Sequence, residues 1–233
     1  MDDLVKNMEE TIIISLGGSL IVPDAIDVEF LKDFKNLILT QIKKEKKFII
    51  ITGGGKTARK YQDAVKLVSS PSNDDLDWIG IASLKLNAEL LRVVFGENAN
   101  REIILNPSND FTFIKPIMIG AAYNPGHSTD WDAVLVAKKV GAKKIINLSN
   151  IDFAYDKDPN KFSDAKKLEN VSWSEYRKLI PAEWSPGLST PFDPTASELA
   201  EQWGMDVDIL NGKNIQNLEK CLNGEDFIGT KIK

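Results

Sequence analysis

Short apolar runs alternate with amphipathic segments along most of the chain. The runs predict buried strands at residues 11–16, 47–52, 101–106, 115–120, 144–148, 206–210 and 229–232, the last of them an edge strand. Apolar side chains recur at helical spacing at residues 27–43, from 56 onward, and at 82–95, 131–140, 171–180, 192–203 and 215–222. Such alternation builds a mostly parallel sheet with helices on both faces. The pattern therefore predicts an α/β protein, a three-layer α/β/α sandwich with a mostly parallel central sheet, in one domain spanning residues 1–233.

Polar segments between these elements predict the loops and the helix starts. Ser, Pro, Asn and Asp cluster at residues 69–77, which indicates a loop that ends with Asp77 as the N-cap of the next helix. Residues 161–167 are also polar and are expected to form a loop. The positions expected to cap the other helices are Asp27, Thr129 with Asp130, Ser172 or Ser174, and Asp193.

Composition narrows the class of protein without naming a function. The chain has 233 residues, 42% of them hydrophobic, and a formal net charge of -5, which argues against general nucleic-acid binding and against a polybasic membrane surface. One cysteine and one histidine allow no intrachain disulfide and make a zinc site improbable. No apolar run approaches the roughly 20 residues that cross a bilayer, and the first ten residues are charged. We therefore expect a cytoplasmic protein.

Two glycine turns follow the first two predicted strands. Gly17 and Gly18 end the first strand, and a turn of this kind permits close approach of a ligand but is equally typical of ordinary strand ends. The second turn, Gly53 to Gly55, lies between a buried strand and a helix, so several backbone amides can face one anion. Lys56 and Arg59 follow it, where they could reach phosphate oxygens. The spacing matches neither the P-loop nor the dinucleotide fingerprint.

A third polar turn lies at residues 124–130, and a fourth begins after the strand at 144–148 with Ser149. Ligands of open α/β sheets bind beyond the carboxyl ends of the strands, so these turns predict a site for two ligands. Asp77 is either a simple helix cap or a carboxylate that accepts hydrogen bonds from ribose hydroxyls. His127 is interpreted as a structural loop residue rather than a catalyst.

Taken together, the motifs resemble those of the amino acid kinase family, and within it the uridylate kinases of archaeal type. The matching residues are Leu16-Gly17-Gly18-Ser19, Thr52 to Tyr61, Asp77 to Ile81, Leu86-Asn87-Ala88, Pro125 to Asp130, Asn150 to Pro159, Asp193 to Ala196 and Gly229-Thr230. The resemblance runs from Thr11 to Ile232 and implies the amino acid kinase, or carbamate kinase-like, fold.

The resemblance implies ATP-dependent phosphorylation of UMP to UDP with Mg2+ that accompanies ATP, and no metal ligand from a protein side chain. It places UMP at Gly54, Asp77, Tyr123, Asn124, Pro125, Gly126, His127, Ser128 and Thr129. It places ATP at Gly18, Ser19, Gly55, Arg59, Ser149, Tyr155 and Asp158. The catalytic groups would be Lys56, Arg59 and Gly18. Residues 1–145 would bind the acceptor, residues 146–233 would bind ATP, and the protein would be a homo-oligomer, a homohexamer by resemblance.

Two alternatives remain open at this point. The first is a kinase for another small phosphate acceptor, such as isopentenyl phosphate. The second is a non-catalytic nucleotide-binding or storage protein, because Ala121 and Phe153 stand where the family usually has glycine. Asp77 and the polar turn at 124–129 favour a nucleotide over an apolar isoprenoid.

Overall fold

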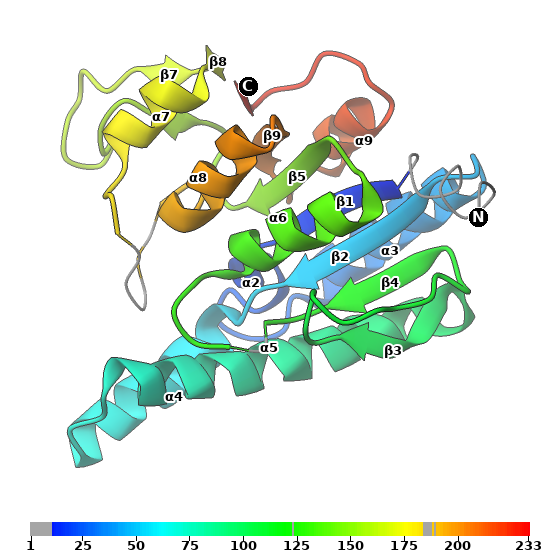
Figure 1. Cartoon of the computed structure of the whole chain (residues 1–233), viewed down its shortest axis with the longest axis horizontal. Helices are drawn as coiled ribbons and strands as arrows, with labels where there is room; N and C mark the ends of the chain where they lie inside the picture. The colour runs from blue at the N-terminus through cyan, green and yellow to red at the C-terminus, as the bar shows by residue number, and fades with distance from the viewer. Residues whose placement is uncertain (1–10, 123, 184–187, 189) are drawn as a thin grey trace.

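The computed structural model describes residues 11–122, 124–183, 188 and 190–233. Eight strands form one sheet in the order β3-β4-β2-β1-β5-β9-β10-β8 (Figure 1). Their bounds are β1 Thr11–Leu16, β2 Lys47–Thr52, β3 Ala99–Ile104, β4 Ile117–Gly120, β5 Lys144–Ser149, β8 Asn170–Val171, β9 Asp206–Asn211 and β10 Thr230–Ile232. Neighbouring strands of this sheet are parallel apart from β9 and β10. The prediction of a mostly parallel sheet is confirmed.

Helices cover both faces of the sheet, with α6 and α8 in front of it and α3 and α9 behind it in the view of Figure 1. The bounds of the helices are α2 Gly18–Ile21, α3 Val28–Ile42, α4 Gly55–Val68, α5 Asn73–Phe95, α6 Thr129–Val140, α7 Trp173–Leu179, α8 Pro194–Gln202 and α9 Ile215–Leu222, with a 3-10 turn at Gly96–Asn98. None of these helices is long and apolar enough to cross a lipid bilayer. The three predicted layers are therefore present.

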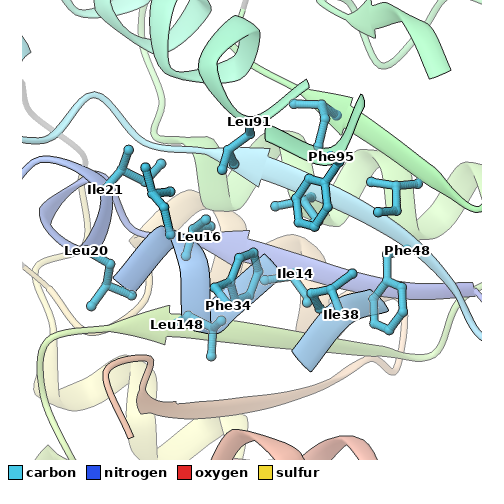
Figure 2. Close-up of a cluster of buried hydrophobic side chains, with 14 of the residues drawn as sticks. Ile14, Leu16, Leu20, Ile21, Phe34, Ile38, Phe48, Leu91, Phe95 and Leu148 are labelled. Atoms are coloured by element: carbon cyan, nitrogen blue, oxygen red, sulfur yellow. The ribbon is translucent and has the colours of Figure 1, made fainter. Parts of the chain in front are cut away.

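Alternating side chains of β1 explain why two separate cores form. Ile13 packs in the cluster under α6, α7 and α8, whereas Ile14 packs in the cluster under α3, α5 and α9. Figure 2 shows the second cluster, where Phe34 and Phe95 meet the sheet residues Ile14 and Phe48. Complete burial of each such side chain contributes about 1.5–3 kcal/mol. A parallel strand that is covered on both faces must be apolar at successive positions, as the sequence of β1 is.

The start of α5 differs from the predicted one. The helix begins at Asn73, because Ser72 and Asp75 form a capping box in which each side chain accepts a hydrogen bond from the other residue's backbone N–H. Acidic residues in a first turn also stabilise the positive end of a helix. The predicted loop at 69–77 is therefore wrong beyond Ser72, and Asp77 lies inside the helix rather than at its cap.

Three smaller expectations are also corrected, and one element was not predicted. β10 lies between β9 and β8, so it is not an edge strand, and β8 lies at that edge of the sheet. Lys167, placed in a loop from the sequence, begins the short strand β7 (Lys167–Leu168), which pairs with β6 (Ala154–Tyr155). The N-cap of α6 is Ser128 and not Thr129 or Asp130. The sequence pattern also missed α2, whose four residues are too few to show a period. The predicted caps Asp27, Ser172 and Asp193 are confirmed.

Candidate functional site at the carboxyl ends of the strands

The two glycine turns pack against each other, backbone to backbone. The Gly17 N–H donates to the Leu148 carbonyl at 2.8 Å, and the Gly53 N–H donates to the Leu16 carbonyl at 2.9 Å. A Cβ on Gly18 would lie 2.0 Å from the Gly55 nitrogen, and a Cβ on Gly53 would lie 2.4 Å from the Gly18 nitrogen. Any side chain at either position would push the turns apart. The first turn therefore does more than end a strand, because it is one half of a two-turn unit.

A pocket of ≈ 190 Å³ opens beside the second turn. Its lining is Gly53, Gly54, Gln62, Asp77, Gly80, Ile81, Leu84, Ala122, Asn124, His127, Ser128 and Thr129. Six residues predicted for the acceptor are thus brought together: Gly54, Asp77, Asn124, His127, Ser128 and Thr129. Pro125 and Gly126 belong to the same turn but do not line the pocket, and Tyr123 lies outside the described residues.

Asp77 joins α5 to the turn at 124–130. The Gly126 N–H donates to its Oδ2 at 3.0 Å. Burial raises the pKa of Asp77, and the Gly126 hydrogen bond opposes that shift. A half-buried carboxylate on a helix that faces a pocket is well placed to accept hydrogen bonds from a ligand.

Two residues that shape this pocket were not among the predicted site residues, although Asn87 belongs to one of the matching motifs. Gln62 lines it, and its side-chain amide donates to the Leu76 carbonyl at 2.8 Å, which ties α4 to α5. The Asn87 amide donates to the carbonyl oxygens of Gly53 at 2.7 Å and Gly54 at 3.2 Å, so it fixes the second glycine turn. Asn87 is 3% exposed, and a polar residue on the buried face of a helix was the available signal.

Lys56 and Arg59 stand in the first turns of α4 with exposed side chains. Neither belongs to the lining of the acceptor pocket. The Lys56 N–H donates to the Val22 carbonyl at 2.9 Å, which anchors the start of the helix beside the first glycine turn. Both residues therefore stand outside the acceptor pocket, at the exposed start of α4.

A buried polar network lies where β1 and β5 end. The Asp130 carboxylate accepts from the Ser15 hydroxyl at 2.7 Å, the Asn147 amide at 2.8 Å and the Asp193 backbone N–H at 3.1 Å. Burial raises the pKa of Asp130 to about 7, against the opposing effect of the Ser15 hydrogen bond. Ser15 and Asn147 were not predicted as site residues, and the sequence signal for them is that each is a polar residue inside an apolar strand.

His127, in the turn before α6, lies close to a second buried acid, Asp132. Its ring lies 4.0 Å, centroid to centroid, from the ring of Trp131. Its Nε2 is 3.8 Å from Oδ1 of Asp132, whose side chain is 1% exposed. In the part of the chain that the structure describes, neither oxygen of Asp132 has a hydrogen-bond partner. Burial raises the pKa of Asp132, and His127 opposes that shift.

The residues expected to contact ATP divide into two groups. Gly18, Ser19 and Gly55 lie in the paired glycine turns, and Ser149 ends β5, with its carbonyl accepting from Gly212 N–H at 2.9 Å. Tyr155 lies in β6, and Asp158 accepts from the Asn160 N–H at 2.9 Å in the turn that follows. Neither Tyr155 nor Asp158 lines the acceptor pocket.

Phe153 and Ala121, which depart from the family pattern, both make packing contacts in the structure. The Lys167 ammonium lies 4.8 Å above the ring of Phe153. Ala121 is 1% exposed in the core beneath α3 and α5, and its N–H donates to the Ile104 carbonyl at 2.9 Å. Ala121 therefore packs as a core residue beside β4.

The described side chains offer no ready-made metal site. Across residues 11–122, 124–183, 188 and 190–233, no group of three or more His, Cys, Asp or Glu side chains could hold one. Magnesium commonly keeps several waters and is held largely by the phosphate oxygens of a nucleotide.

Comparison with known proteins identifies the family of the chain. The sequence model described as the amino acid kinase family matches residues 10–101 and 109–211. The chain is 33% identical to a uridylate kinase of Thermoplasma acidophilum, covering 97% of each protein, and 31% identical to one of Methanobrevibacter smithii, covering 95% of this chain and 98% of the relative. The crystal structure of uridylate kinase from Archaeoglobus fulgidus superposes with a TM-score of 0.80 at 26% identity, over 95% of this chain and 99% of that one. This chain belongs to the amino acid kinase family.

Proposed function

We propose that the protein transfers the γ-phosphoryl group of ATP to UMP and releases UDP and ADP. The observation that carries this proposal is the pocket that joins Asp77 and Gly54 to the turn at 124–129. Relatives that match this chain over nearly its whole length are named uridylate kinases. Asp77 can accept hydrogen bonds from the ribose hydroxyls of a nucleotide. An isoprenoid phosphate has no ribose hydroxyls, so Asp77 favours a nucleotide.

The acceptor is assigned to residues up to about 145 and the donor to residues from about 146, apart from the glycine turns, which both nucleotides share. UMP takes the pocket, with its ribose at Asp77 and its phosphate at the backbone of Gly53 and Gly54. ATP takes the other side of the turns, toward Gly18, Ser19, Gly55, Arg59, Ser149, Tyr155 and Asp158. Magnesium that accompanies ATP would supply charge neutralisation on the transferred group, and no protein side chain is assigned to hold it.

The chemistry needs positioning and charge stabilisation rather than a covalent intermediate. An oxygen of the UMP phosphate forms a bond to the γ-phosphorus as the bond from that phosphorus to the bridging oxygen of ADP breaks. The UMP phosphate is already ionised at neutral pH, so no general base is required. Backbone amides of the paired turns hold the phosphoryl group, and Lys56 and Arg59 balance the charge as it shifts toward ADP.

A homo-oligomer belongs to the same proposal, as a homohexamer by family resemblance. Trp78, Leu86 and Val93 are 50%, 63% and 64% exposed on α5. Their spacing puts them on one side of the helix. Exposed apolar side chains in a row mark a surface that another protein covers.

The test is a coupled ADP-release assay with ATP, magnesium and a panel of acceptors that includes UMP, CMP, AMP and isopentenyl phosphate. We expect turnover with UMP. Asp77→Ala should raise KM for UMP about 10- to 100-fold, because it removes a charged hydrogen-bond acceptor from the pocket. The control is Asp74→Ala, an exposed acid one turn earlier on α5, which should leave KM unchanged. ATP binding without turnover on any acceptor would contradict the proposal.

A further inference from the structure

Gln62 is a lining residue of the acceptor pocket for which the transfer reaction itself has no need. It lies half-buried on α4 and lines the pocket together with Asp77 and Gly80 of α5. A Cβ on Gly80 would lie 3.4 Å from Nε2 of Gln62, so the glycine lets the amide approach α5 closely. Residues three apart share one face of a helix. The Gln62 amide therefore lies beside Asp77, the residue at which the ribose is placed.

The contact with Leu76 determines which way the Gln62 amide faces. A backbone carbonyl only accepts hydrogen bonds, so the amide nitrogen must be the atom that lies 2.8 Å from the Leu76 oxygen. The amide oxygen, Oε1, is on the other branch and is left as an acceptor. Because the nitrogen is held by α5, this oxygen is oriented before a ligand arrives.

Asp77 supplies a second acceptor on the same wall of the pocket. Its Oδ2 accepts from the Gly126 N–H at 3.0 Å, and an ionised carboxylate has about four sites for hydrogen bonds. Asp77 thus keeps capacity for a ligand. Two neighbouring acceptors suit a ligand with two neighbouring hydroxyl donors. The ribose of a nucleotide has such a pair at its 2′ and 3′ positions, whereas neither the base nor the phosphate of UMP offers one.

The surroundings of the two acceptors indicate which hydroxyl each one takes. With the phosphate at the second glycine turn, the base is left to the turn at 124–129. Asp77 bonds Gly126 of that turn, so Asp77 lies on the base side of the ribose. Gln62 is on α4, the helix that begins at the glycine turn, and so lies on the phosphate side. In a nucleotide the 2′-hydroxyl is the one nearer the base, and the 3′-hydroxyl is the one nearer the carbon that leads to the phosphate.

We propose that Gln62 is a specificity-determining residue that accepts a hydrogen bond from the 3′-hydroxyl of the acceptor's ribose, while Asp77 accepts one from the 2′-hydroxyl. The inference rests on the proposed function, because it concerns how the acceptor pocket selects a ribonucleotide. A monophosphate that lacks either hydroxyl leaves a partly buried acceptor without a donor, and the pocket discriminates against it for that reason. Neither hydroxyl is among the reacting atoms, so Gln62 acts in binding and not in the transfer.

The experiment measures kcat and KM in the coupled assay with UMP, 2′-deoxyUMP and 3′-deoxyUMP as acceptors. The proteins are the wild type, Gln62→Met and the control Gln202→Met, whose glutamine is exposed at the end of α8. Methionine keeps the length of glutamine but has neither the amide nitrogen nor the amide oxygen. For the wild type we expect kcat/KM about 10-fold lower with 3′-deoxyUMP than with UMP, and about 30-fold lower with 2′-deoxyUMP, because Asp77 is a charged acceptor.

Gln62→Met should change the response to one analogue and not to the other. We expect kcat/KM for UMP to fall about 10-fold, through a higher KM at nearly unchanged kcat, and kcat/KM for 3′-deoxyUMP to stay within about 2-fold of the wild-type value. The preference for UMP over 2′-deoxyUMP should remain. Loss of the bond to Leu76 could instead loosen the contact of α4 with α5, but a purely structural change would lower kcat/KM for all three acceptors by the same factor. Gln202→Met should behave as the wild type.

The possible results separate the inference from the proposed function. Equal kcat/KM of the wild type with UMP and 3′-deoxyUMP would overturn the inference without any variant. Equal losses for all three acceptors in Gln62→Met would also overturn it, as would a loss of preference at the 2′ position instead of the 3′ position. Each of these results keeps the proposed function as long as the wild type turns over UMP. A wild type that phosphorylates none of the three acceptors overturns both.

Discussion

The two ends of the central sheet treat buried carboxylates differently. At the amino ends, Asp208 of β9 is 2% exposed and pairs with the Lys144 ammonium at 2.9 Å. Burial alone would lower the pKa of Lys144, but the hydrogen bond to Asp208 raises it above its ordinary value. At the carboxyl ends, Asp130, Asp132 and Asp193 lie close together, and no lysine or arginine in the described chain pairs with any of them.

This difference between paired and unpaired buried carboxylates indicates which end of the sheet is structural and which is functional. In the Lys144–Asp208 pair each charge is already neutralised by the other, so neither is left to bind a ligand. We therefore interpret the amino ends of the strands as structural. A group of buried acids without a lysine or arginine is costly in a folded protein. Buried ionisable groups with shifted pKa values, such as Asp130 and Asp132, are more typical of functional sites than of purely structural ones. The comparison predicts that substitutions at the carboxyl end change activity, whereas those at the amino end change only stability.

The largest expected effect is that of Gly18→Ala. The new Cβ would lie 2.0 Å from the Gly55 nitrogen, so the paired turns must separate. We expect about 3 kcal/mol of lost stability from overpacking. Misplacement of the reacting groups should lower kcat about 100-fold.

The control for Gly18→Ala is Gly141→Ala at the end of α6, where φ is +74 and a Cβ meets nothing within 4 Å. Backbone strain alone should cost about 1 kcal/mol there and leave kcat unchanged. Thermal unfolding and the coupled assay measure both variants. Near-normal activity of Gly18→Ala would show that the two turns do not form one catalytic unit.

The next effect concerns Asp130 and pH. Its raised pKa of about 7 means that the folded protein keeps a proton that the unfolded chain releases near pH 4. Stability from this group is therefore full below about pH 4 and is lost as pH rises toward about 7. Asp130→Asn should remove that slope, which amounts to roughly 4 kcal/mol between about pH 4 and about pH 7.

Urea unfolding at about pH 4.5 and about pH 7.5 checks the Asp130 prediction, with Asp33→Asn as the control. The stability of Asp130→Asn relative to the wild type should increase with pH. Parallel pH profiles for the wild type and Asp130→Asn would mean that Asp130 is already ionised throughout.

The smallest effect is expected at the amino end. Lys144→Met leaves Asp208 buried without its cation, but the lysine side chain is 52% exposed and water screens part of the loss. We expect a decrease of about 1–2 kcal/mol in the free energy of unfolding and no change in KM for UMP. Lys143→Met, at the exposed neighbouring position, should change neither quantity. A change in KM with Lys144→Met would remove the distinction between the two ends.

The layers could be predicted from the sequence, but the start of α5 and the polar network could not. The apolar run of β1 shows that the strand is covered on both faces wherever it lies in the sheet. The start of α5 was missed because Asn and Asp favour both loops and first helical turns, and the Ser72 to Asp75 capping box decided between them. The short strands β7 and β8 depend on partners distant in the chain, and their own residues carry no clear period.

The sequence by itself determined which backbone segments can lie against an anion, because glycine turns after buried strands are local features. Only the tertiary structure decided which polar side chains meet. Asp130 bonds Ser15 and the Asp193 backbone, which lie 115 and 63 residues away in the chain. The exposure and charge of such groups follow from the order of strands and the crossing of helices. Local sequence determines the backbone conformation of each turn. The burial of a side chain depends on the whole fold, and burial in turn governs the charges of the site.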